Sequence, residues 1–211
     1  MSTRSFSVID RFLGEIDKAI KVLAAPARSV RPLPAAAEDT PLSAAQRAES
    51  ARFMRVNHSG EVAAQALYHG QALTAGDATV AAALKTAAAE EADHLAWCES
   101  RLNELNGRTS VLNPLWYVGS FAIGALAGAF GRGASLGFVA ETERQVEAHL
   151  RGHMQRLGPD ARSLAILEQM THDEMQHGAQ ASSLGGIEPP FPLGAAMNLT
   201  SRLMTHGSYW L

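Results

Sequence analysis

The sequence Glu91-Ala92-Asp93-His94 places a glutamate and a histidine three residues apart, and Glu174-Met175-Gln176-His177 repeats this spacing later in the chain. Residues three apart on a helix lie on one face, so each pair can present two ligands in the same direction. A further glutamate precedes each pair, Glu61 the first and Glu143 the second. Two matching sets of Glu and Glu-x-x-His are typical of a two-metal site inside a four-helix bundle.

A turn signal lies at the midpoint of each set. Gly76-Asp77 lies midway between the first glutamate and the first pair, and Gly158-Pro159-Asp160 has the same place in the second set. Glycine ends helices, proline interrupts them and aspartate is a good N-cap, so each set is expected to form two antiparallel helices. Paired ligands then lie at one height above the turn. The pattern therefore predicts an all-α fold in which two hairpins bring four carboxylates and two imidazoles together.

Composition narrows the class of protein. A length of 211 residues suits one domain, and a hydrophobic content of 46% supports a full core. The net charge of −3 gives no basic footprint, so no nucleic-acid partner is expected. The single cysteine, Cys98, excludes a disulfide framework and a Cys-based zinc site, and is expected to be a packed thiol. The first 22 residues lack a signal-peptide core and carry Asp10, Glu15 and Asp17, which predicts a bacterial cytoplasmic protein.

The chain is expected to divide into an N-terminal accessory region, 1–42, and a bundle, 43–211. The accessory region consists of an amphipathic helix over 6–23 and a Pro-rich linker over 24–41. The bundle begins at Ser43, where Ser43-Ala44-Ala45-Gln46 fits a capping box, and its first helix runs to about 75. The other bundle helices are expected at about 78–106, from after 133 to near 157, and at about 161–184. A last apolar accessory helix is expected near 195–206.

The segment between the two hairpins is unusual because residues 109–131 carry no charge. Hydropathy alone would suggest a membrane span, and Gly124 and Gly128 form a GxxxG pair, but a span would separate the six ligands. We therefore expect a long apolar crossover over 109–132, and its Gly and Pro content argues against a single straight helix. Either it is buried core, or it lies in the membrane interface with Trp116 and Tyr117 as anchors. The second interpretation is favoured because few polar residues are present to cover an exposed side.

Four clustered carboxylates repel one another, and two divalent ions would balance their charge. Oxygen-rich ligation with one imidazole per metal and no thiolate suits iron or manganese better than structural zinc. By geometry, Glu91 and Glu174 are expected to bridge the two ions. The terminal ligands, one glutamate and one histidine for each ion, are then Glu61, His94, Glu143 and His177. Six ligands leave open positions, as a catalytic metal site needs.

Several neighbours of these ligands are candidates to orient them. His58 and His149 are the preferred candidates to hydrogen-bond a ligand, and Asp93 and Asp173 adjoin the Glu-x-x-His motifs. Gly60, beside Glu61, interrupts a predicted helix at a cost of about 0.5–1 kcal/mol against alanine. Close packing beside the site is the expected reason for it.

Four stretches resemble the di-iron demethoxyubiquinone hydroxylases of ubiquinone biosynthesis. They are Arg55-Val-Asn-His58-Ser-Gly60-Glu61, Glu91-x-x-His94, Ala140-Glu-Thr-Glu143-Arg and His172-Asp-Glu174-Met-Gln-His177. The similarity runs from about Ser43 to the C-terminus, and all six metal-ligand positions match. The resemblance implies a ferritin-like fold, a centre of two iron ions, and O₂-dependent hydroxylation of the quinol ring of a polyprenylated demethoxyubiquinol.

The same resemblance implies a peripheral membrane enzyme, which we expect at the cytoplasmic face of the bacterial inner membrane. Its partners would be the quinol, O₂ and the membrane surface, and a homo-oligomer or a lipid-presenting partner protein is compatible with it. The alternatives are a ferritin-like protein for iron storage or peroxide scavenging, a metal-free helical scaffold, and a di-iron oxidase acting on a different lipid or arene.

Overall fold

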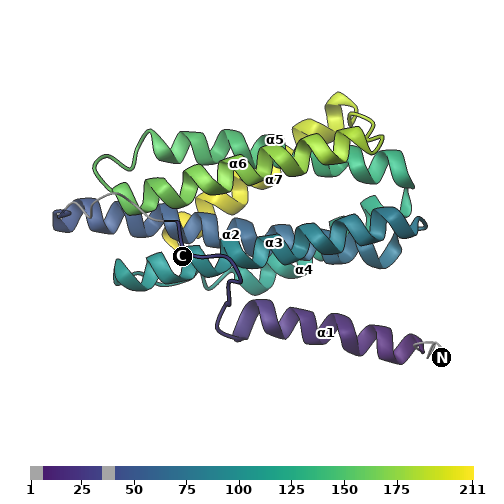
Figure 1. Ribbon diagram of the computed structural model, residues 1–211, viewed down its shortest axis with the longest axis horizontal. Coiled ribbons are helices and arrows are strands. Elements are labelled where there is room, and N and C mark those ends of the chain that lie inside the picture. Colours follow the sequence, from purple (N-terminus) through teal and green to yellow (C-terminus); the bar gives the residue numbers. More distant parts are fainter. Residues whose placement is uncertain (1–6, 35–40) are drawn as a thin grey trace.

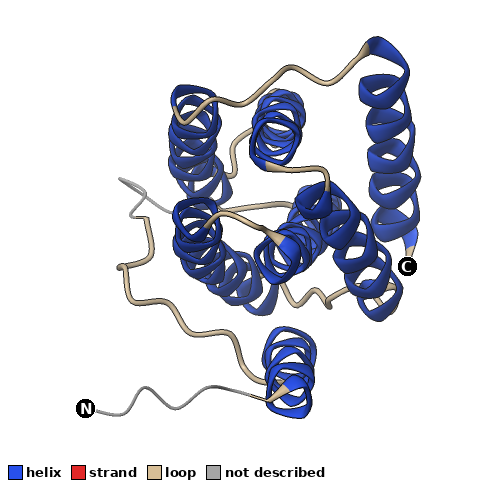
Figure 2. Ribbon diagram, turned by 90° about the vertical axis from the view of Figure 1, so that its right-hand side faces the viewer, coloured by secondary structure: helices blue, strands red, loops and turns tan. Residues whose placement is uncertain are grey.

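The computed structural model describes residues 7–34 and 41–211, and within these ranges the chain is helical, with no strand (Figure 1). Both predicted hairpins are present. The first joins α2 (Ala44–Thr74) to α3 (Ala78–Glu104), and the second joins α5 (Arg132–Met154) to α6 (Ala161–Ser183). Seen from the end, these helices are grouped side by side, with the other helices around them (Figure 2). The predicted all-α bundle is confirmed.

Local capping explains where the bundle helices begin. Ser43 accepts a hydrogen bond from the backbone N–H of Gln46, whose side chain accepts one from the backbone N–H of Ser43. Asp77 accepts from the N–H groups of Thr79 and Val80 at the start of α3. Asp160 plays the same part for α6, where it accepts from the N–H of Ser163. These caps satisfy donors that a helix N-terminus leaves free, so the turn signals act as expected.

Two apolar clusters fill the bundle on either side of the ligand positions. One contains Phe53 of α2, Trp97 of α3 and Met170 of α6, and the other contains Tyr68, Leu84 and further residues nearer the opposite ends of the same helices. The predicted ligands occur between these two clusters along every bundle helix. Cys98 lies fully buried in the first cluster, as expected of a packed thiol. The fold thus encloses a polar layer between two apolar ones.

The crossover contains one continuous helix, α4 (Asn113–Ala129), so the expectation that glycine and proline would prevent a single helix was wrong. Pro114 lies in the first turn, where its missing N–H leaves no helical bond unmade. The glycines allow α4 to approach α2 closely. A Cβ atom at Gly124 would lie 2.2 Å from the carbonyl oxygen of Leu67, and one at Gly128 would lie 2.5 Å from that of Gln71. The GxxxG pair therefore packs within this chain.

Tyr117 is buried, which does not suit the anchoring role expected of it, whereas Trp116 is half-buried and its role as a membrane anchor stays a prediction. The Trp116 indole N–H donates a 3.0 Å hydrogen bond to the hydroxyl of Ser208, and Tyr117 is only 4% exposed. Other apolar side chains of α4 and of its C-cap are exposed: Leu115, Val118, Leu126 and, at the C-cap, Phe130. One face of α4 is therefore core and the other is an uncovered apolar surface.

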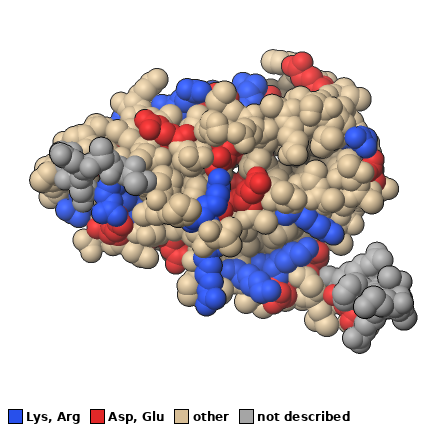
Figure 3. All heavy atoms as spheres, in the orientation of Figure 1, with Lys and Arg blue, Asp and Glu red and all other residues tan. Residues whose placement is uncertain are grey.

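Two accessory helices flank the bundle (Figure 1). The first is α1 (Val8–Ala24); its predicted start at Phe6 and the linker residues 35–40 lie outside the described residues. The other is α7 (Phe191–Trp210), which is longer at both ends than expected. No helix in the described part of the chain has both the length and the hydropathy needed to cross a membrane. Figure 3 shows acidic and basic side chains interspersed on one face of the molecule.

Candidate metal centre

The six predicted ligands meet in the buried middle of the bundle. Glu61 comes from α2, Glu91 and His94 from α3, Glu143 from α5, and the remaining pair from α6. Two groups form there. Glu61, Glu91, His94 and Glu174 make the first, and Glu91, Glu143, Glu174 and His177 make the second; within each group the ligand atoms lie within 4.8 Å of one another. Every member is buried.

Glu91 and Glu174 belong to both groups, whereas each of the other four residues belongs to one. This sharing is what the bridging assignment from the sequence requires. Each group also contains one imidazole, so neither ion position would lack a nitrogen donor. The arrangement offers two adjacent positions with two carboxylates in common, as in di-iron carboxylate bundles.

The donor set fits divalent metal ions. Four buried side-chain atoms at the centre make no hydrogen bond: Glu91 Oε1, Glu143 Oε1, Glu174 Oε2 and His177 Nδ1. Buried polar atoms normally have partners, so an unpartnered group of carboxylate and imidazole atoms calls for one. Oxygen donors with a few imidazoles suit metals such as iron and manganese. The residues present therefore match the metal centre that the sequence predicts.

Burial opposes ionisation of the two shared glutamates, but contacts with the two histidines outweigh it and lower the pKa of Glu91 and of Glu174. The other four ligands hold protons tightly. Burial raises the pKa of Glu61 and of Glu143 well above the usual glutamate value. Burial opposes the charged form of His177, but the close contacts of its ring with the carboxylates of Glu174 and Glu91 outweigh it and raise the pKa of the imidazole to about 12. The pKa of His94 is also raised, because the Glu91 charge and further carboxylate contacts outweigh burial. Metal binding must displace such protons, so the site exchanges proton charge for metal charge.

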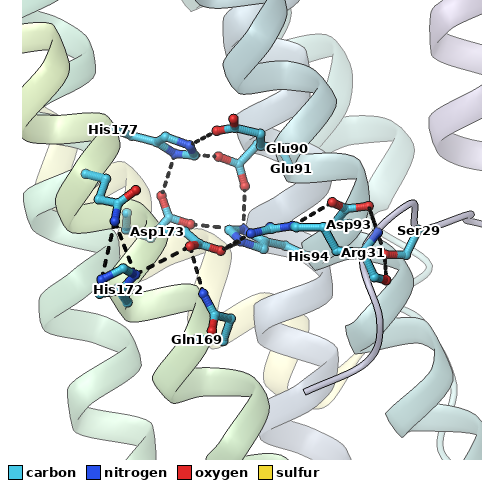
Figure 4. A network of polar contacts seen from close by, with 12 residues as sticks. Ser29, Arg31, Glu90, Glu91, Asp93, His94, Gln169, His172, Asp173 and His177 are labelled. Carbon is cyan, nitrogen blue, oxygen red and sulfur yellow. Dashed lines mark hydrogen bonds and ion pairs between the residues drawn. The ribbon is translucent and has the colours of Figure 1, made fainter. Parts of the chain in front are cut away.

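Each histidine is held from behind by an acidic residue of the other hairpin (Figure 4). His94 directs Nδ1 at the centre, 2.8 Å from Glu91, and its Nε2 lies 2.9 Å from Asp173. His177 has Nδ1 at the centre, 3.2 Å from Glu91, and its Nε2 lies 2.5 Å from Glu90. A carboxylate behind a ligating imidazole fixes its tautomer and orientation.

Sequence reasoning selected the wrong histidines for this supporting role. The Nδ1 of His58 pairs with the side-chain amide of Asn113 at 3.3 Å, and His149 packs against the ring of His153. Glu90 was missed, although its position carries a signal. An acid directly precedes the shared glutamate in each motif, as Glu90 before Glu91 and as Asp173 before Glu174.

An apolar cavity of about 270 Å³ lies between α2, α4, α5 and α7. Gly60 and Thr142 line it, and each is the sequence neighbour of a predicted ligand, Glu61 and Glu143. A Cβ atom at Gly60 would meet nothing within 4 Å. Close packing was therefore the wrong reason for this glycine, which instead leaves space in the cavity wall.

A second hollow, of about 450 Å³, reaches Glu143 and Glu174 from between α5 and α6. Its wall carries the charged side chains of Glu141, Arg144 and Glu188. The polar hollow is therefore lined by two of the predicted ligands, whereas the apolar cavity is lined by residues adjacent to two ligands in the sequence.

Comparison with known proteins shows the family to which this chain belongs. The sequence pattern of the family described as "Ubiquinone biosynthesis protein COQ7" matches residues 48–208. The chain belongs to this family. The match includes all six predicted ligands and, apart from the first four residues of α2, the helices that carry them.

Curated relatives in this family match over nearly the whole chain. A protein of Dechloromonas aromatica is 54% identical over 202 residues, covering 95% of this chain and 98% of the relative. One from Azoarcus sp. (strain BH72) is 54% identical over 204 residues, covering 96% and 99%. One from Ralstonia pickettii is 53% identical over 215 residues, covering 96% and 99%. Each of these relatives is named 3-demethoxyubiquinol 3-hydroxylase.

Proposed function

We propose that this chain is a di-iron monooxygenase that hydroxylates the quinol ring of a polyprenylated demethoxyubiquinol with O₂. The observation that carries the proposal is the pair of buried ligand groups that share Glu91 and Glu174. Membership of the COQ7 family supplies the pathway, and the relatives' names supply the substrate. An iron store would need similar ligands, but the relatives are named as hydroxylases.

In this proposal, Glu61 and His94 would hold one iron ion, Glu143 and His177 would hold the other, and the two shared glutamates would lie between them. Bound iron supplies the redox chemistry that activates O₂. The protein's own contribution is positional. Asp173 and Glu90 fix the imidazole rings so that Nδ1 of each faces the centre. The apolar clusters on either side exclude water from it.

The apolar cavity is the proposed quinol site because residues adjacent to two predicted ligands line it and because its apolar wall suits a lipid. Thr142 and Gln145 offer polar groups that can meet the ring oxygens. The wall formed by α7 includes Met197 and Met204, whose unbranched side chains adapt to a flexible chain. Few polar groups within an apolar wall are the usual composition of a small-molecule site.

We also propose that the protein is peripheral at the cytoplasmic face of the bacterial inner membrane, where its polyprenylated substrate resides. The two accessory helices and the crossover helix expose large apolar side chains, namely Ile9 and Phe12 of α1, Leu126 of α4, and Leu199 and Leu203 of α7. Exposed apolar helix faces of this kind favour insertion into the membrane interface.

The test of the proposed function is genetic and chemical. A strain that lacks its own demethoxyubiquinol hydroxylase is complemented with this chain, and its quinones are profiled. Restoration of ubiquinone with loss of the demethoxy precursor is expected. An unchanged profile, with the protein expressed and folded, would contradict the assignment.

The variant Glu91→Gln provides the matched metal test. The amide keeps the size of the side chain but loses the charge that both groups share, so the chain should lose both ions. We expect turnover to fall by more than about a hundredfold, beyond the range typical of a lost outer partner. Glu147→Gln is the control, because Glu147 pairs with Arg151 rather than with the centre. Iron content and hydroxylation are measured together, and an active Glu91→Gln enzyme would refute the shared-ligand assignment.

A further inference from the structure

A short N-terminal strap, residues 25–34, lies along α3 and joins α1 to the bundle. The backbone N–H of Ala27 donates to Glu99 at 2.9 Å. Further along the strap, the Ser29 hydroxyl and the Val30 N–H donate to Asp93 Oδ1 at 2.8 and 2.7 Å. Asp93 is the residue directly before His94, so the strap is fastened next to the predicted metal centre.

Arg31 extends from the strap to two acids on different hairpins (Figure 4). Its Nε donates to Asp93 Oδ2 at 2.7 Å, and its Nη1 donates to Asp173 Oδ2 at 2.8 Å. The guanidinium also lies over the Trp97 ring, 4.7 Å from its centroid. A planar guanidinium with several fixed donors suits this bridging geometry better than an ammonium group.

Asp173 carries the contact on to a predicted ligand. The same oxygen that accepts from Arg31, Oδ2, lies 2.9 Å from Nε2 of His94, while Oδ1 accepts from Gln169 at 2.9 Å. The carboxylate is thus held by three side chains, and the imidazole is held by the carboxylate. A continuous path leads from the strap to the Nδ1 atom that faces the centre.

The other histidine has no equivalent support. His177 is backed by Glu90, whose side chain is 47% exposed. Among the ion pairs in the described part of the chain, none joins an arginine or lysine to Glu90. The two halves of the centre therefore have matching ligands, but among the described residues only the carboxylate behind His94 is paired with an arginine.

We propose that Arg31 is a positioning residue for the His94 half of the metal centre. It locks Asp173, and through it the His94 ring, and its charge offsets the two aspartates that lie beside the four glutamates. This inference rests on the proposed metal function. It goes beyond the shared family pattern, which begins at residue 48 and does not include the strap.

Removal of Arg31 should affect one ion more than the other. Asp173 would keep Gln169 and His94 but lose the cation that balances its charge, so the imidazole would be held less firmly. His177, Glu90 and the ligands on that side would keep all of their contacts. A residue that only fastened the strap would change stability without distinguishing between the two ions.

The test compares anaerobic Fe²⁺ titrations of the full-length chain, with Mössbauer spectra of the loaded protein. Arg31→Met, which keeps an unbranched side chain over Trp97, should bind one ion as wild type does. It should bind the other about tenfold more weakly, at the lower end of the range for a lost outer partner. Arg31→Lys keeps the positive charge but not the planar group with several donors. Its affinity for the weakened ion should lie between that of wild type and that of Arg31→Met. The Mössbauer signal of one iron should change while the other stays.

A second variant keeps the test decisive if Arg31→Met folds poorly. Asp173→Asn should reproduce the selective loss with the strap still fastened at Asp93. Adding Arg31→Met to it should change the affinity little further, because residues that act along one path are not additive. Arg132→Met is the matched control, since it removes another arginine ion pair, to Asp77, at the end of the bundle. It should bind both ions as wild type does.

Two outcomes would overturn the positioning role while leaving the proposed function intact. They are wild-type affinity for both ions in Arg31→Met and Asp173→Asn, and an equal loss of both ions in the two variants. Failure of the wild-type chain to bind Fe²⁺ would instead overturn the proposed metal function, and the inference with it.

Discussion

Gly60 is a residue whose role comes from the side chain that it lacks. It lies in the middle of α2, where glycine costs about 0.5–1 kcal/mol against alanine. No neighbour requires that absence, since a Cβ atom would meet nothing within 4 Å. The residue instead faces the apolar cavity beside Glu61. The helix therefore gives up stability at a position where space next to the centre is useful.

Gly60→Leu should fill this space and block the substrate without disturbing the metal. We expect kcat/KM for demethoxyubiquinol to fall by about tenfold or more, which corresponds to roughly 1.4 kcal/mol of lost binding. Iron content should stay at the wild-type value, because the side chain of Glu61 is not altered. Steady-state hydroxylation and iron analysis measure the two effects separately. Gly60→Ala is the control and should remain active, and a fully active Gly60→Leu enzyme would place the substrate elsewhere.

At the same scale, the six ligands and the candidate Asp173 behind His94 could be predicted from sequence, but the role of Arg31 could not. A Glu-x-x-His spacing fixes two side chains on one helix face, so local geometry is enough to find it. The contact between Arg31 and Asp173 joins positions far apart in the chain, and no local spacing records it. His58 was chosen because it shares a helix face with Glu61, but the residue opposite it is Asn113 from the crossover.

At the scale of elements, the packing of α4 on α2 depends on glycines at the contact. Gly124→Ala would place a methyl group 2.2 Å from the Leu67 carbonyl oxygen, so the helices must separate. We expect a loss of about 1–3 kcal/mol in the free energy of unfolding, as is typical of overpacking. Urea denaturation measures the change in the free energy of unfolding. In thermal unfolding, the melting temperature should fall by about 2–4 °C per kcal/mol for a chain of this size.

Gly119→Ala is the matched control in the same helix. A Cβ atom there would meet nothing within 4 Å, so alanine should stabilise α4 by about 0.5–1 kcal/mol through its higher helix propensity. Opposite signs for the two substitutions are the expected result. If both stabilised the protein, the close approach of α4 to α2 would be wrong.

The bundle helices were predicted well from the sequence, and the crossover helix was not. The bundle helices carry caps at Ser43, Asp77 and Asp160, and each cap acts within three residues of itself. The crossover was misjudged because glycine and proline were taken as helix breakers. Pro114 in a first turn and Gly124 at a helix contact are compatible with a helix, but only the tertiary arrangement shows that they occupy those positions.

At the scale of the whole molecule, α1, α4 and α7 expose apolar faces that the bundle does not cover. Leu126 of α4 and the C-cap residue Phe130 are 64% and 76% exposed, so changing both to aspartate should leave the fold intact. We expect binding to vesicles of anionic bacterial lipids to weaken by at least about tenfold, because burial of each side chain contributes about 1.5–3 kcal/mol. Flotation measures binding, and activity on detergent-dispersed substrate should persist. Gln180→Asp on α6 should float as wild type does, and unchanged flotation of the α4 variant would exclude this face.

Buried histidines should make the whole fold sensitive to acid. Burial lowers the pKa of His58 from its ordinary 6.5 to about 4, because the folded protein disfavours the charged imidazole. Its contribution to stability is therefore complete above pH 6.5, where both states are neutral. Below that, the unfolded chain takes up a proton that the folded chain refuses, so the contribution declines and is lost as the pH falls through about 4.

His58→Gln should reduce this loss while leaving other acid effects in place. Between pH 6.5 and 4, its free energy of unfolding should fall less steeply than that of wild type, by at most about 3 kcal/mol over the interval. Urea denaturation at a series of pH values measures the slope. The exposed His206→Gln serves as the control and should retain the wild-type slope. If His58→Gln also retained it, the imidazole would have to be accessible to protons in the folded protein, and the packing of α4 over this part of α2 would have to be looser than the Asn113 contact indicates.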